Sequence, residues 1–422
     1  YNAGLLLLEN ENYIDAISYF TNAILIDSVF VAAYLSRARC YQESNDELAI
    51  ADYRTVFSLD STNLQSLYSV AALQLKSDKV LAKQTYQTII SLNKIEYKAY
   101  SQLGVIAFLA KDYQEAEQLF TQSLAINKNA YTLNDRGSCY RKLEQFDAAI
   151  QDYLAAIALK NNLAFVYNNL ASVYAKQGEK EKALSYYDLA ISKDVNYALA
   201  YNNKASLLLE NKEYDKANLA IEKALIANPE YAPAYNNKGV IYHQFKRYND
   251  AIAQFKRSIA LKPSNSEYWY KLAKVYHAQG KLKDAESSYR AAIAEGSGNA
   301  EAYFFFGVFI EERGNINEAI SSYRKAIELK SNFPQARQSL GHILAKEGNL
   351  DEAIQEFELL LQYDKNNPSL HLTLGKLLME LNQDEKAILY LNKVADLLPQ
   401  DFEARIKIAD LFMEKGMLEQ SI

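Results

Sequence analysis

The chain has 422 residues, of which 49% are hydrophobic and 23% are charged, and its formal net charge is −6 at pH 7. This composition is typical of a folded globular protein, and no run of about 18 apolar residues is present that could span a bilayer. The mild acidic balance also argues against a nucleic-acid-binding protein, because such proteins usually carry a concentrated basic surface.

Alanine recurs along the chain at intervals of 33 or 34 residues, and always at 34 from Ala149 onward. In most units a glycine or alanine stands twelve residues before this alanine, and a large residue stands four residues after it. Self-similarity at one fixed period indicates an array of repeated structural units. The alanines that mark the period are Ala16, Ala49, Ala82, Ala116, Ala149, Ala183, Ala217, Ala251, Ala285, Ala319, Ala353 and Ala387.

The units follow one another from end to end without a Pro/Gly-rich linker. The unit 31–62 has lost one residue between its two marks, and Val70 replaces the small residue in the next unit. Because the chain begins with Tyr1 rather than Met, we expect it to be a fragment of a longer protein. A partial unit at 1–30 is followed by eleven full units and a second partial unit at 402–422; the full units are 31–62, 63–96, 97–129, 130–163, 164–197, 198–231, 232–265, 266–299, 300–333, 334–367 and 368–401.

The spacing of apolar residues within a unit is helical. In the unit 164–197, apolar residues recur at helical intervals from Tyr167 to Tyr174, Gly178 interrupts the series, and a second helical series starts at Ala183. Each unit should therefore contain two helices of roughly 14 residues joined by a short turn. Two helix axes approach to about 8 Å only where the facing side chains are small, so the small residues should mark the contact between the helices.

These marks resemble the tetratricopeptide repeat family, whose unit is a helix-turn-helix of 34 residues. The family's terminal proline is kept only at Pro229, Pro263 and Pro399. The resemblance covers essentially the whole chain, and it implies an all-α fold, a right-handed α-solenoid superhelix running through 1–422 as one array. The unit 266–299 shows the pattern most fully, with Trp269, Leu272, Ala273, Tyr276, Ala285, Tyr289 and Ala292.

The resemblance also implies that the first helix of each unit lines a concave groove that binds other proteins. Counted from the first residue of each full unit, one row of asparagines occupies position five and a second row occupies position six. Carboxamides offer a donor and an acceptor, which suits the backbone of an extended peptide. A hydrated groove wall without a ligand is the alternative. The position-five row is Asn134, Asn168, Asn202 and Asn236, and the position-six row is Asn169, Asn203 and Asn237.

The same face becomes aromatic further along the chain. Tyr270 and Phe304 occupy position five, and Phe305 occupies position six. Exposed aromatic side chains beside hydrogen-bonding groups are typical of interface anchors. We therefore include these three residues in the predicted peptide groove, while packing onto a neighbouring unit is the alternative.

Position four changes character towards the C-terminus. It is aromatic in most central units but becomes Arg337, His371 and Arg405 in the last ones. Because charged groups do not pack as tyrosine does, two expectations follow from the sequence. The terminal units stack differently, or they meet another domain.

The sequence shows no constellation of residues typical of catalysis or metal binding. Cys40 and Cys139 lie about three units apart, too far for a disulfide. His243 and His277 share one position on adjacent units, too far apart for a zinc site without further ligands. We expect no catalytic residue, no metal and no cofactor in this chain. The compartment stays open, with the cytoplasm slightly favoured.

The sequence thus predicts a protein–protein interaction scaffold that binds an extended peptide or partner segment along its concave groove. The alternatives are a substrate-recognition arm of a larger enzyme, such as a glycosyltransferase, and a structural subunit of a multiprotein assembly. We expect protein partners and no nucleic acid, while a homo-oligomer is left open. Position nine carries no asparagine in any unit, so we do not expect the carboxylate clamp of chaperone-binding relatives.

Overall fold

A computed structural model describes residues 1–416 and contains 25 α-helices and no strand within that range. The all-α prediction is confirmed. The chain divides into two compact units, Tyr1–Leu207 and Leu208–Ile422, and the division falls within helix α13 (Ala198–Glu210). The prediction of one continuous array over 1–422 stays a prediction, and the second helix expected in 402–422 lies outside the described residues.

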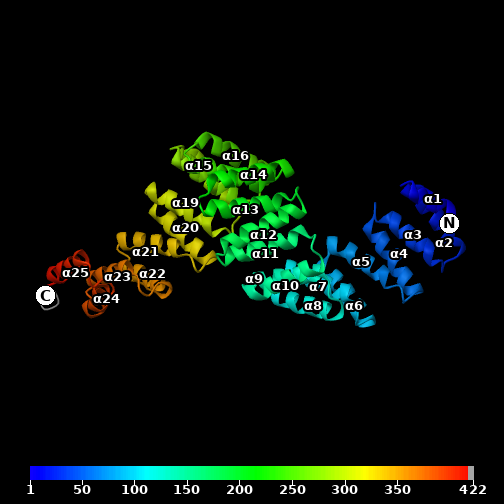
Figure 1. Ribbon diagram of the computed structural model, residues 1–422, viewed down its shortest axis with the longest axis horizontal. Helices are drawn as coiled ribbons and strands as arrows, with labels where there is room; N and C mark the ends of the chain where they lie inside the picture. Colours follow the sequence, from blue (N-terminus) through cyan, green and yellow to red (C-terminus); the bar gives the residue numbers. More distant parts are fainter. Residues whose placement is uncertain (417–422) are drawn as a thin grey trace. The chain divides into compact units, whose positions relative to one another are not determined.

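Most of the helices are labelled in Figure 1. Those that precede α13 are α1 (Asn2–Glu9), α2 (Tyr13–Ile26), α3 (Val31–Tyr41), α4 (Asp46–Leu59), α5 (Leu64–Ser77), α6 (Lys79–Leu92), α7 (Tyr97–Leu109), α8 (Tyr113–Ile126), α9 (Ala130–Lys142), α10 (Phe146–Leu159), α11 (Ala164–Lys176) and α12 (Lys180–Lys193). Those that follow it are α14 (Tyr214–Ala227), α15 (Ala232–Gln244), α16 (Tyr248–Leu261), α17 (Ser266–Ala278), α18 (Leu282–Glu295), α19 (Ala300–Glu312), α20 (Ile316–Leu329), α21 (Pro334–Lys346), α22 (Leu350–Tyr363), α23 (Pro368–Glu380), α24 (Asp384–Leu397) and α25 (Phe402–Glu414).

Most repeats have a turn of the same form between their two helices. The first helix ends where one residue takes a left-handed conformation, such as Gly178 with φ of 79° or Lys111 with φ of 66°. In some repeats a side chain then caps the start of the second helix. In α8 the Asp112 side chain accepts a hydrogen bond from the backbone N–H of Glu115 at 3.0 Å. Local chemistry therefore reverses the chain and brings the two helices of a repeat against each other.

In most repeats the core centres on a small residue of the first helix and a ring of the second. The small residues at the marked positions, including Ala171 and Ala183, are fully buried. At Gly104 a Cβ atom would stand 2.7 Å from Cε1 of Phe120, and at Gly239 it would stand 2.9 Å from Cε1 of Phe255. The backbone of the first helix therefore lies directly against the ring, as the small residues in the sequence predict.

In several repeats the side chain at position four donates a hydrogen bond to the loop before the repeat. Tyr167 donates through its hydroxyl to the Asn161 carbonyl at 3.0 Å, and Trp269 donates through Nε1 to the Pro263 carbonyl at 2.9 Å. The same bond forms from Tyr235 to the Pro229 carbonyl at 3.0 Å. In each case the acceptor lies six residues before the donor.

The charged residues at position four make the same contact. Arg337 donates to the Ser331 carbonyl from Nε at 3.3 Å and from Nη2 at 3.2 Å. His371 is buried, and its Nε2 lies 3.0 Å from the Lys365 carbonyl, which can only accept. Arg337 and His371 therefore make the hydrogen bond that tyrosine makes in other repeats, and the expectation that the terminal units stack differently stays a prediction. Arg405 is exposed.

A search of the described residues finds no helix that combines the length and the apolar character needed to cross a bilayer.

Replacing Gly104 by Ala should destabilise the protein. The added Cβ collides with the buried ring of Phe120, and overpacking of this kind costs roughly 1–3 kcal/mol. Gly298→Ala is the matched control, because a Cβ at Gly298 meets nothing within 4 Å. Urea unfolding should separate the two variants, and equal midpoints would show that the helix–ring contact is not tight.

Candidate functional site

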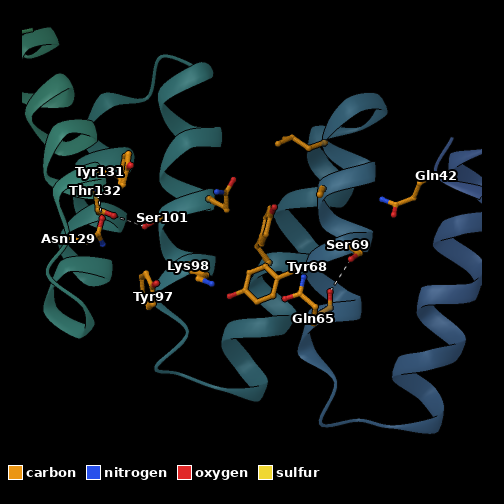
Figure 2. Close-up of a pocket in the computed structure, with 14 residues that line it drawn as sticks. Gln42, Gln65, Tyr68, Ser69, Tyr97, Lys98, Ser101, Asn129, Tyr131 and Thr132 are labelled. Carbon is orange, nitrogen blue, oxygen red and sulfur yellow. Dashed lines mark hydrogen bonds between the residues drawn. The ribbon is translucent and has the colours of Figure 1, made fainter. Parts of the chain in front are cut away.

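A hollow of about 640 Å³ opens in the first compact unit along the first helices of successive repeats. Figure 2 shows that side chains from α5 and α7 project into the space between these helices, while α9 closes one end. The lining residues are Gln42, Gln65, Tyr68, Ser69, Ala72, Leu75, Tyr86, Tyr97, Lys98, Ser101, Gln102, Asn129, Tyr131 and Thr132.

The turn that precedes α6 differs from those of the regular repeats. Helix α5 ends at Ser77 and α6 begins at Lys79, so that Asp78 alone makes the turn. Asp78 accepts hydrogen bonds from the backbone N–H groups of Val80 at 2.8 Å and Leu81 at 3.1 Å, and it is not in a left-handed conformation. The hollow therefore lies beside the repeat whose turn and position-eight residue, Val70, both depart from the pattern.

Several polar groups of the hollow are already fixed by hydrogen bonds. The Tyr68 hydroxyl donates to the Glu96 carboxylate at 3.0 Å, and burial together with this contact raises the Tyr68 pKa. Ser101 Oγ lies 2.7 Å from Ser123 Oγ and 3.1 Å from Thr132 Oγ1. These contacts fix the walls of the hollow and do not involve the side chains of Gln65, Lys98 and Gln102.

Other polar groups of the hollow remain free. The side chains of Gln65 and Lys98 are exposed and that of Gln102 is half-buried. Throughout residues 1–416, none of the three forms a side-chain hydrogen bond or ion pair. Together they offer two carboxamides and one ammonium group on facing helices. These groups can bind a backbone or an uncharged polar side chain.

Aromatic and polar side chains dominate the lining of the hollow. Its lining includes four tyrosines but no Asp, Glu, His or Cys. Tyrosine presents a broad apolar ring with a polar tip, which is why it is common at interfaces. Among the described residues, no group of three or more His, Cys, Asp and Glu side chains could hold a metal ion.

A second hollow, of about 270 Å³, lies on α7 and α9 and is mostly apolar. Its lining includes Asp135 and Arg141, and the Arg141 Nε is buried without a hydrogen-bond partner. Burial raises the Asp135 pKa, although Asn134 Nδ2 donates to the carboxylate at 3.1 Å and opposes this shift. The Asp135 carboxylate therefore lies where burial disfavours its charged form.

The position-five asparagines do not line an open groove. Asn134, Asn168, Asn202 and Asn236 are buried, and the exposed fraction of Asn168 is 2%. Their burial does not agree with the expectation that these four side chains are open to the groove. A role in ligand binding stays a prediction for them.

Two of these asparagines bind the position-six asparagine of the following repeat. Asn169 Nδ2 donates to Asn134 Oδ1 at 2.9 Å, and Asn203 Nδ2 donates to Asn168 Oδ1 at 3.0 Å. Asn169 and Asn203 are half-buried, whereas Asn237 is buried. The two rows therefore connect neighbouring repeats through amide–amide hydrogen bonds within the first compact unit.

The predicted aromatic anchors lie together in the second compact unit. The Tyr270 and Phe305 rings stack with centroids 5.5 Å apart, and Phe304 packs 5.1 Å from both Phe305 and Phe333. All three predicted residues are half-buried. They pack onto neighbouring repeats, the alternative left open by the sequence, and a role as anchors stays a prediction.

The sequence-based prediction placed the binding face in 130–333 and missed the hollow at α5 and α7. The available signal was the irregularity of the units 31–62 and 63–96, where a residue is lost and Val70 stands in place of a small residue. Departures from a regular period alter helix spacing, and they could have directed attention to this segment.

Family models for the tetratricopeptide repeat match much of the chain. Models described as "Tetratricopeptide repeat" match residues 97–130, 166–192, 220–253, 269–301 and 344–411. A model described as "TPR repeat" matches 137–178, 241–280 and 312–348.

Curated relatives match only a short stretch. DnaJ homolog subfamily C member 7 of Homo sapiens and that of Mus musculus are each 39% identical over 64 residues, which is 15% of this chain. The match spans 13% of the length of these relatives.

Solved structures match over a much longer part of the chain. Yeast Tom70 aligns over 98% of this chain and 95% of its own at 16% identity, with a TM-score of 0.51. The human IFIT1 dimer with m7Gppp-AAAA aligns over 92% and 95% at 16% identity, with a TM-score of 0.54. A tetratricopeptide repeat protein from Parabacteroides merdae aligns over 59% and 98% at 19% identity, with a TM-score of 0.50. At these identities the likeness shows the fold alone.

Replacing Asn168 by Ala should reduce the free energy of unfolding by about 1–3 kcal/mol, because the half-buried amide of Asn203 loses its acceptor. Asn161→Ala is the control, since its side chain is exposed and only its backbone carbonyl is used. Urea unfolding of both variants measures the difference. A fully stable Asn168→Ala protein would restore the interpretation of this residue as a groove side chain.

Asp135→Asn should stabilise the protein at pH 7, and the gain should shrink as the pH falls. The Asp135 pKa is raised in the folded state, so the stability linked to its protonation is present below the unfolded pKa and is lost as the pH rises through the folded pKa. An asparagine side chain at this position does not ionise, so the variant does not lose this stability as the pH rises. Unfolding measured from pH 7 downward tests this, and a gain independent of pH would contradict it.

Proposed function

Because the chain belongs to the tetratricopeptide repeat family, we propose that it is a protein–protein interaction scaffold that binds an extended polar segment of a partner in the hollow between α5 and α7. The proposal rests on one observation above all. Gln65, Lys98 and Gln102 present unused hydrogen-bonding groups on facing helices, beside tyrosines that are held in place.

The lining favours a segment with few charged side chains. Lys98 is the only charged residue that lines the hollow, and it is exposed. An extended chain offers a carbonyl and an N–H at each residue, and carboxamides can bind both. Tyrosine rings such as Tyr97 add apolar contact with little loss of conformational freedom.

Hydrogen bonds and a ring contact already fix parts of the wall of the hollow. Ser123 Oγ donates to the Tyr97 carbonyl at 2.8 Å, and Lys160 Nζ donates to the Tyr131 hydroxyl at 2.8 Å. Tyr131 also stacks with Phe165 at 6.2 Å between ring centroids. Side chains that are already ordered cost less conformational entropy on binding.

The test is a selection of peptides from a random phage library on the full chain, followed by affinity measurement. Changing Gln65 and Gln102 together to Ala removes two hydrogen bonds of about 0.5–1.5 kcal/mol each. Affinity for selected peptides should fall about five- to 150-fold.

Gln87→Ala combined with Gln118→Ala is the matched control, because both side chains are exposed on the second helices of the same two repeats. These peptides should bind the control variant as tightly as the unchanged chain. The proposal fails if no peptide is selected, or if the selected peptides bind the Gln65/Gln102 variant with full affinity.

A further inference from the structure

Lys274 on α17 is a half-buried cation without a counterion. Its ammonium lies 4.0 Å from the centroid of the Phe305 ring, close enough for a cation–π contact. This ammonium forms no ion pair and no hydrogen bond with any other residue in 1–416. Burial, with a smaller contribution from Lys271, lowers the Lys274 pKa.

Two other lysines that lie over aromatic rings are neutralised by carboxylates, while Lys160, Lys193 and Lys256 lie over rings but are exposed. Lys330 lies over Phe333 and also binds the Glu301 carboxylate at 3.0 Å. Lys182 lies over Tyr174 and pairs with Glu179. An aromatic ring alone does not replace the water that a buried ammonium loses. Lys274 therefore differs from these lysines in lacking an anion.

The aromatic side of the Lys274 site is rigid. Phe305 is clamped between Tyr270, whose ring stacks on it with an interplanar angle of 24°, and Phe304. Helix α17 packs against both α15 and α19, which are the first helices of their own repeats. The ring is thus fixed on one side of the ammonium, and any incoming group must approach from another side.

The ionisable neighbours of Lys274 leave its positive charge uncompensated. The Lys271 ammonium is bound to the Glu267 carboxylate at 2.5 Å, and Glu312 is engaged with His277 at 2.8 Å. Burial, together with the positive charge of Lys274, lowers the pKa of His243 on the neighbouring helix α15. No acid contributes to the shift of Lys274.

We propose that Lys274 forms a binding site for an oxyanion, a carboxylate or a phosphoryl group, carried by a protein segment. An arriving anion compensates a charge that the fold has already desolvated, and desolvated pairs attract more strongly than exposed ones. The Phe305 ring covers one side of the ammonium. An ammonium donates charge-assisted hydrogen bonds, which an oxyanion accepts. His243, on the neighbouring helix α15, senses the charge of Lys274 and serves as the reporter of binding.

This inference rests on the proposed function in one respect, namely that the ligand is a segment of a protein. The residues of the α5–α7 hollow belong to the other compact unit. Their variants therefore test the proposed function without changing Lys274.

Histidine NMR provides a direct test, because the chain has only four histidines. The full chain with ¹³C-labelled histidine is titrated with inorganic phosphate against sodium chloride at equal ionic strength. The His243 resonance should shift saturably, while the buried His371 should not move. The site assignment is overturned if His243 does not respond.

Lys274→Met removes the charge and keeps an apolar stem against Phe305, so the phosphate-induced shift of His243 should fall at least tenfold. Lys274→Arg should retain it. Lys283→Met is the matched control, an exposed lysine on α18 of the same repeat, and its response should equal that of the unchanged chain. An undiminished shift in a folded Lys274→Met protein would refute the role of Lys274.

Three peptides of glycine and serine then distinguish the sources of the oxyanion. They differ only in a central glutamate, phosphoserine or glutamine. Either acidic peptide should shift His243, the larger response identifies the natural group, and the glutamine peptide should leave His243 unchanged. A response to phosphate but to neither acidic peptide would overturn the assignment to a protein ligand, whereas the proposed function would stand on the hollow alone.

Discussion

The contact between a small residue of the first helix and a ring of the second is the constraint on which most repeats depend. At Gly104 and Gly341 there is no room for a Cβ atom beside Phe120 and Phe357. The distance between the two helices is therefore set by a backbone lying on a ring. Once this distance is fixed, each remaining position of the repeat lies in its core, in the contact with a neighbouring repeat or on the exposed face.

This constraint explains why the fold could be predicted from the sequence. Small residues and rings act within one repeat, so their spacing appears directly in the period. The surroundings of the asparagines depend instead on how one repeat lies on the next. Asn168 and Asn203 meet although they are separated by a full repeat, and the burial of Asn168 follows from that contact. A count of positions within one unit contains no such information.

The two binding sites proposed for this protein arise from opposite causes. The hollow between α5 and α7 is lined in part by the repeat in which the pattern is broken, the one with the one-residue turn at Asp78. The Lys274 site lies where the pattern is intact and an aromatic cluster holds a charge that no carboxylate neutralises. Sequence reasoning identified Tyr270 and Phe305 of that cluster. It did not identify Lys274, because an unpaired charge is recognised only when all neighbours are known.

The bond from position four has a consequence for how such a chain can change. Phenol, indole, guanidinium and imidazole groups all donate to a backbone carbonyl, and that carbonyl belongs in turn to Asn161, Pro263, Ser331 and Lys365. The acceptor stands where the family's proline would stand, and its side chain takes no part. A joint of this kind, a side chain bound to the backbone of the preceding loop, does not require two complementary side chains. Repeats can consequently be duplicated, lost or exchanged during evolution while the joints between them still form.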